Sequence, residues 1–160
     1  MTKHTEVILY YLYLFRFLNR SQIQMLLGHK HFNRIIKWMN ELSKNGYVRQ
    51  YRNPKIITKQ TTYSLGLKGR QYLKKSERDD IDEKLLDRVW REHKMSHEFR
   101  EHCIFIAVCY LSLQKLSESS NSKLYFYTKV QLHDMQYLYT DPQCLDSKSW
   151  STKRDLSINC

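Results

Sequence analysis

Glycine and proline are scarce in this chain. Its 160 residues include two prolines and four glycines, and the glycines, Gly28, Gly46, Gly66 and Gly69, all lie in the first half. Because glycine breaks regular structure, we expect these residues to mark the ends of elements. No internal repeat and no low-complexity tract is present. A chain of this length is expected to bury one ordinary core or two small ones.

Cysteine is also sparse, and its spacing excludes two common kinds of site. The four cysteines, Cys103, Cys109, Cys144 and Cys160, all lie in the second half, and no two form a C-x-x-C pair. This pattern argues against a zinc ribbon and against a thioredoxin-like redox site. Cys103 and Cys109 belong to the apolar run "CIFIAVC", where we expect buried thiols in the reduced form rather than a disulfide.

No hydrophobic run is long enough to cross a membrane, because a spanning helix needs roughly 18–20 apolar residues. The closest run, residues 7–18, is interrupted by Arg16 and lacks the layout of a signal peptide. The sequence therefore predicts an intracellular, cytoplasmic protein with no membrane partner.

Acidic residues are nearly missing from the first half. The net charge of the chain is +11, but residues 1–75 hold 15 lysines and arginines and only two acids, a net +13, whereas residues 76–160 carry a net −2. This asymmetry predicts a polyanionic partner for the first half. A solvated basic surface without a partner is the alternative.

Apolar periodicity predicts two helices at the start of the chain. The first covers residues 5–18, is apolar nearly all round, and is expected in the core or in a dimer contact. The second covers residues 21–28, where Ser21 and Gln24 have the spacing of a capping box and Gly28 is the expected stop.

A third helix is predicted from about residue 30 to residue 44. One face of it should be buried, with polar and basic residues on the opposite side. The residues expected on the buried face are Phe32, Ile35, Ile36, Met39 and Leu42.

The segment "ELSKNGYVRQYRN" then changes from a helical to a strand-like pattern at Gly46. We expect Gly46 to adopt a left-handed conformation in which the chain reverses. A strand over residues 47–51, a basic connection, and a second strand over residues 61–65 should follow. "LKGRQYLKK" should close the unit as a short helix.

This order of elements resembles the winged helix-turn-helix superfamily of DNA-binding proteins. The resemblance is strongest in "LSKNGYV" and "TTYSLGLKGRQYL". It implies a DNA-binding domain over residues 1–75 and double-stranded DNA as the partner. The fold expected for the whole chain is α+β and mostly helical.

Residues 74–84 are polar and charged, and they are interpreted as a boundary. Two helices are expected next, the second ending near Leu116, followed by a loop over residues 117–122 and strands that could form a hairpin. Residues 76–160 are therefore predicted to form a smaller domain of helices and strands, which dimerises or is a degenerate or truncated nuclease-like domain.

The candidate DNA contacts lie on the third helix and on the predicted wing. A recognition helix enters the major groove with its N-terminal half, where Arg and Lys suit guanine and Asn suits adenine. Wing cations are expected to contact phosphate or the minor groove. The candidates are Lys30, Asn33, Arg34 and Lys37 on the helix, and Arg49, Arg52, Lys55 and Lys59 on the wing.

The segment "WREHKMSHEFREH" holds a possible metal site. His93 and His97 are four residues apart, a spacing that can place two imidazoles on one ion if both lie on one helix. "HEFREH" departs from the zinc-protease motif, because its second histidine, His102, falls one residue late. A charged helix face without metal is the alternative, and we expect no cofactor.

The whole chain also resembles the replication-relaxation proteins of plasmids and other mobile elements, and the related MobC-type relaxases, through the wing and "MSHEFREHCIFIAV". The resemblance implies a second domain similar to metal-dependent nucleases, with Glu98 and Asp155 as its acids. The chain departs from that pattern, because no Glu-x-Lys follows Asp155, and a metal-dependent phosphodiesterase needs several carboxylates and a lysine.

Three functions follow from these patterns. The first is a non-enzymatic DNA-binding protein of a mobile element, involved in replication, mobilisation or control of its own operon. The second is a winged-helix transcription regulator that dimerises through its second half. The third is a metal-dependent nickase or relaxase that uses Glu98 and Asp155, with His93 or His97 as a further candidate ligand.

Overall fold

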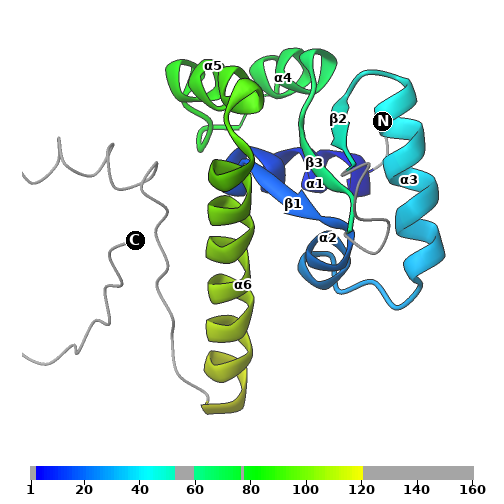
Figure 1. Cartoon of the computed structure of the whole chain (residues 1–160), viewed down its shortest axis with the longest axis vertical. Helices are drawn as coiled ribbons and strands as arrows, with labels where there is room; N and C mark the ends of the chain where they lie inside the picture. The colour runs from blue at the N-terminus through cyan, green and yellow to red at the C-terminus, as the bar shows by residue number, and fades with distance from the viewer. Residues whose placement is uncertain (1–2, 53–59, 77, 121–160) are drawn as a thin grey trace, which may run out of the picture. The chain divides into compact units, whose positions relative to one another are not determined.

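A computed structural model describes residues 3–52, 60–76 and 78–120, and the chain divides into two compact units, Met1–Ser112 and Leu113–Cys160. The described part is mostly helical with a small antiparallel sheet, which confirms the expected α+β class (Figure 1). Its elements are α1 (Lys3–Phe15), β1 (Phe17–Asn19), α2 (Arg20–Leu26), α3 (Phe32–Lys44), β2 (Val48–Tyr51), β3 (Thr62–Leu65), α4 (Leu67–Lys74), α5 (Glu83–Arg91), the 3-10 helix η1 (Glu92–Lys94) and α6 (His97–Ser120).

The sheet has β3 at its centre. β3 pairs antiparallel with β1 on one side and with β2 on the other, so that Ser64 lies opposite both Phe17 and Arg49. All four residues of β3 are buried, so both faces of this central strand are covered. β2 and β3 are the two strands that the sequence predicted after Gly46.

β1 was not predicted. The sequence indicated one helix over residues 5–18, but α1 ends at Phe15, and Arg16 adopts a left-handed φ of 68°. Phe17 and Leu18 continue as β1, and both side chains are buried. Because both of these neighbours are apolar and covered, the segment has no alternation that would distinguish a strand from a helix.

The core of the first unit forms where α1, α3 and the sheet meet. α1 contributes Ile8, Leu9, Leu12, Tyr13 and Phe15, and α3 contributes a single stripe. These helices therefore pack by one face each, and the outer face of α3 remains at the surface. Side chains that are almost completely buried include Ile8, Leu9, Leu12, Ile35, Met39, Tyr63 and Leu65.

Two glycines end helices in the way the sequence predicted. Gly28 follows α2 with a φ of 59°, and Gly46 follows α3 with a φ of 76°. In both turns the N–H groups of the glycine and of the next residue donate to carbonyl groups of the last helical turn. A residue with a β-carbon pays a steric cost in this left-handed region, which explains the glycines.

The capping box of α2 lies two residues earlier than expected. Asn19, and not Ser21, is the N-cap: its side chain accepts a hydrogen bond from the N–H of Gln22 at 2.9 Å. The Asn19 N–H donates in return to Oε1 of Gln22 at 3.0 Å. The helix begins at Arg20 because β1 carries the chain in extended form up to Asn19.

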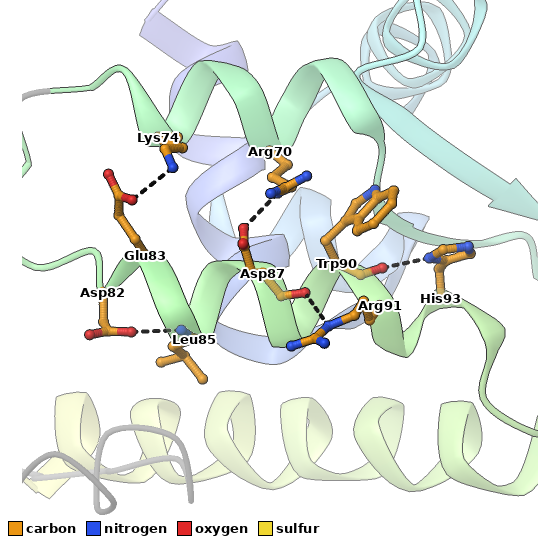
Figure 2. A network of polar contacts seen from close by, with 9 residues as sticks. All are labelled: Arg70, Lys74, Asp82, Glu83, Leu85, Asp87, Trp90, Arg91 and His93. Carbon is orange, nitrogen blue, oxygen red and sulfur yellow. Dashed lines mark hydrogen bonds and ion pairs between the residues drawn. The ribbon is translucent and has the colours of Figure 1, made fainter.

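α4 and α5 pack beside each other through charged pairs (Figure 2). Arg70 Nε lies 2.7 Å from Oδ1 of Asp87, and Lys74 Nζ lies 2.8 Å from a carboxylate oxygen of Glu83. Asp82 caps the first turn of α5. These contacts attach α5 to the helix that closes the hairpin.

The beginning of α6 lies beside the β1 edge of the sheet, and α3 lies beside the β2 edge (Figure 1). Gln22, which is buried, donates from Nε2 to the carbonyl of Ile104 at 2.7 Å. The rings of Phe17 and Phe99 meet edge to face at 6.2 Å between centroids. Residues 97–112 are therefore part of the same unit as the sheet.

α6 continues to Ser120, so the loop predicted over residues 117–122 is wrong for residues 117–120. The hydroxyls of Ser119 and Ser120 donate to the carbonyl of Leu116, a local side-chain-to-backbone bond that serines make within helices. The strands expected after residue 122 lie outside the described residues.

Candidate nucleic-acid interface

The orientation of α3 is fixed by one buried stripe. Ile35 and Met39 are completely buried, and Leu42 is nearly so. These positions are four and three residues apart, so they define one side of the helix. His31 precedes α3 as an extended N-cap residue, and the glycine turn at Gly28 separates α3 from α2.

The opposite side of α3 is basic and exposed. Asn33, Arg34 and Lys37 are all exposed, as is Lys30 in the turn before the helix. Glu41 is the one acid on α3. The four helix residues that the sequence selected are therefore at the surface, three of them on the helix and one in the turn that leads into it.

The hairpin adds two exposed cations. Along β2, Val48 is buried and Arg49 is exposed, the alternation expected of a strand with one covered face. Arg52 follows the strand and is also exposed. Lys55 and Lys59, the other two wing candidates, lie outside the described residues.

These exposed cations differ from other basic residues of the first half. Within the described residues, no ion pair joins Lys30, Arg34, Lys37 or Arg49 to an acid. Four other cations bind partners inside the unit. They are Arg16 with Glu92 at 3.2 Å, Arg20 with the Tyr63 hydroxyl at 2.7 Å, Arg70 with Asp87, and Lys74 with Glu83.

A cluster of rings flanks α3, and no pattern in the sequence indicated it. His4 stacks on Trp38 with ring centroids 4.8 Å apart, and His29 meets the same ring edge to face at 5.1 Å. His29 Nδ1 also accepts a hydrogen bond from the N–H of His31 at 3.1 Å. These contacts hold the start of α1 and the turn before α3 against the side of α3.

Phe32 does not occupy the buried position predicted for it. It is the first residue of α3, and 38% of its surface is exposed. The periodicity correctly identified Ile35, Met39 and Leu42, but the core ends at Ile35, one turn short of the helix start. Ile36, also expected on the buried face, is only partly buried.

His93 and His97 do not lie on one helix. His93 belongs to η1, Met95 is extended, and His97 begins α6, so their spacing does not place the two imidazoles on one helical face. His93 Nδ1 donates to the carbonyl of Trp90 (Figure 2), and His97 Nε2 lies 3.8 Å from Glu101. Within the described residues, no group of three or more His, Cys, Asp or Glu side chains could hold a metal ion.

Of the two acids suggested by the nuclease resemblance, Glu98 is the one that lies within the described residues. Glu98 is exposed in the first turn of α6. The pKa of its carboxyl group is lowered, most by a hydrogen bond from its own backbone and next by a hydrogen bond from the Ser96 side chain. Asp155 lies outside the described residues. No step of hydrolysis is supported by Glu98 alone.

The two described cysteines are free thiols, as predicted. Cys103 is buried and Cys109 is partly buried, which makes Cys109 more accessible than expected. Burial raises the pKa of Cys103 to about 11. A thiol with so high a pKa is a poor nucleophile near neutral pH, and it serves as part of the apolar face of α6.

Comparison of the chain with protein-family models, with curated proteins and with solved structures found no match. Among the helices of the described residues, none combines the length and the apolar character of a membrane span.

Proposed function

We propose that this protein binds double-stranded DNA through a winged helix-turn-helix. In this proposal α3 is the recognition helix, α2 precedes it across the turn at Gly28, and the β2–β3 hairpin is the wing. The order of α1, β1, α2, α3, β2 and β3, with β3 central in a three-stranded sheet, supports this assignment.

The observation that carries the proposal is the set of exposed cations on and beside α3. Lys30, Arg34 and Lys37 are exposed on and just before the N-terminal half of the helix, which is the part that enters the major groove in helix-turn-helix proteins. Arg49 is a further exposed cation on β2. Duplex DNA is the polyanion whose groove dimensions suit a single exposed helix.

The process that this binding serves is inferred from the resemblance to replication-relaxation proteins. We place the protein in the cytoplasm, in the replication, mobilisation or operon control of a mobile element. In this role it acts as a DNA-binding protein and not as an enzyme.

Titration of labelled duplex DNA with the full chain tests the proposal. The variant Lys30→Ala/Arg34→Ala/Lys37→Ala should lose most of its affinity. The control Lys84→Ala/Arg91→Ala/Lys115→Ala removes the same charge from exposed positions on α5 and α6, and it should bind almost as well as the wild type. Equal affinities for the two variants would contradict the assignment of α3.

A regulator that pairs two copies is the second candidate, and the exposed apolar side chains of α6 favour it. Phe105 and Val108 are 60% and 45% exposed, while Cys103 and Ala107 on the other side of the helix are buried. A helix with apolar side chains on two faces is expected to bury both. Sedimentation velocity would support pairing if Phe105→Glu shifted a dimer to a monomer.

A further inference from the structure

The start of α3 presents an aromatic ring among cations. Phe32 is the first residue of the helix and is 38% exposed, whereas Ile35, one turn further along, is completely buried. Lys30, Asn33 and Arg34, its near neighbours in sequence, are all exposed. Phe32 is therefore only partly covered by the rest of the chain.

Phe32 shares the side of Ile35 and Met39, but as the first residue of α3 it lies at the end of the helix that enters the groove in the proposed complex. Side chains in a helix lean toward the N-terminus, so a residue in the first turn extends beyond the helix start. That end of a recognition helix contacts base edges. A ring exposed there loses its water when the helix enters the groove, and this is favourable only against an apolar group.

The major-groove edges of the bases offer one apolar group, the C5 methyl of thymine. Phenylalanine is among the side chains that contact this methyl. We propose that Phe32 is a specificity-determining residue that packs on a thymine methyl and selects a T·A pair at one position of the site. This inference rests on the proposed DNA-binding function, and it adds an apolar contact to the polar candidates Asn33, Arg34 and Lys37.

The test removes the methyl from the DNA and the ring from the protein. Duplexes that bind best are selected by the full chain from a random-sequence pool and synthesised with thymine, or with uracil at each thymine in turn. Uracil keeps the pairing and lacks the methyl group. At one position the wild type should lose about fourfold in affinity, the loss expected for one buried methyl-sized group.

The protein variants then assign that loss to Phe32. Phe32→Ala should bind the thymine and uracil duplexes equally well, and Phe32→Leu, which remains apolar, should keep part of the preference. Leu67→Ala removes an apolar side chain that is 47% exposed on α4, and it should keep the whole preference. Circular dichroism melting confirms that each variant is folded.

The outcomes separate this inference from the proposed function. Tight duplex binding without any thymine preference, or a preference that persists in Phe32→Ala, would overturn the role of Phe32 and leave DNA binding intact. Selection of no sequence over another would also overturn it, because a specificity-determining residue needs a specific site. Failure to bind duplex DNA at all would overturn both.

Discussion

Single residues decide where the elements of this chain begin and end. The sequence predicted that Gly28 and Gly46 end helices, because each follows a stretch with helical apolar periodicity and precedes a change of pattern. Arg16 could not be predicted, because a left-handed φ is uncommon in residues other than glycine. The burial of Gln22 likewise could not be predicted, because Gln22 bonds to Ile104 of α6, which lies 82 residues away in sequence.

Gly69 lies within α4 and not at the end of an element, and it is required by a close approach between α4 and the residue before β2. A β-carbon added at Gly69 would lie 2.3 Å from the carbonyl oxygen of Tyr47. Replacing glycine by alanine in a helix usually gains about 1 kcal/mol, but here the overlap with backbone should dominate. Gly69→Ala should therefore lower the free energy of unfolding by about 1–3 kcal/mol in urea denaturation.

The control for this prediction is Gln71→Ala, an exposed position on the same helix, which should change stability little. Unchanged or increased stability of Gly69→Ala would show that the backbone near Tyr47 moves aside at little cost.

Glu92 should make stability depend on pH in a recognisable direction. Its carboxylate lies 3.2 Å from Arg16 Nε, yet burial raises the pKa of Glu92 more than Arg16 and Arg88 lower it. The folded state then binds a proton at Glu92 more readily than the unfolded state. Stability from this group is present at pH values below its ordinary pKa of 4.5 and is lost as pH rises through the higher folded pKa.

Comparison with a second acid tests this sign. The pKa of Glu98 is lowered, mainly by its own backbone hydrogen bond, so its contribution should be lost as pH falls. As pH is lowered from 7, the free energy of unfolding of the wild type should rise relative to that of Glu92→Gln. For Glu98→Gln the difference should change in the opposite direction. Parallel trends for the two variants would contradict the account of Glu92.

At the scale of elements, sequence patterns identified most helices and both strands of the hairpin. Periodicity succeeded for α3 and β2 because these have one covered side and one exposed side. β3, whose four residues are all buried, was identified instead by residue types that favour strands. Periodicity failed for β1, whose apolar residues Phe17 and Leu18 are both buried. Contacts with distant segments decide such cases, and no local pattern records them.

Arg34 and Arg49 should contribute to DNA binding in different ways. Where Arg34 reads a base, Arg34→Ala should cost about 1–3 kcal/mol on the selected site and should relax the preference at one base pair. Arg49 lies on β2, where contact with phosphate is expected, so Arg49→Ala should weaken all sequences by a similar factor.

Competition binding over a panel of single base-pair changes measures both effects. If Arg34→Ala and Arg49→Ala changed the preference profile equally, the division of roles between helix and wing would be wrong.

At the scale of the whole molecule, charge asymmetry was the strongest signal, and it required no knowledge of the fold. The sequence could count the cations of the first half but could not separate those on the surface of α3 from those bound within the unit, such as Arg20 and Arg70. Distinguishing the two groups of cations requires knowledge of tertiary contacts between residues more than ten positions apart in sequence. It reduces the candidate interface to a few side chains.

We expect no nicking of supercoiled DNA by the full chain in Mg²⁺ or Mn²⁺. A divalent cation needs several oxygen ligands, and Glu98 has no companion acids or histidines that could complete a metal site among the described residues. Agarose gel assays of a supercoiled plasmid measure this. Cleavage that disappears in both Glu98→Ala and Asp155→Ala would establish the nickase alternative, whereas cleavage indifferent to both would indicate a contaminating nuclease.

The salt dependence of duplex DNA binding tests the central claim most directly. Each phosphate neutralised by a cation contributes roughly −0.9 to the slope of log K against log salt concentration. Contacts by Lys30, Arg34, Lys37 and Arg49 therefore predict a slope of about −3 to −4 for the wild type. The variant Lys30→Ala/Arg34→Ala/Lys37→Ala should reduce the magnitude of this slope by about 2–3, while Lys84→Ala/Arg91→Ala/Lys115→Ala should leave it unchanged. A slope near zero for the wild type, or equal slopes for the two triple variants, would contradict DNA binding through α3.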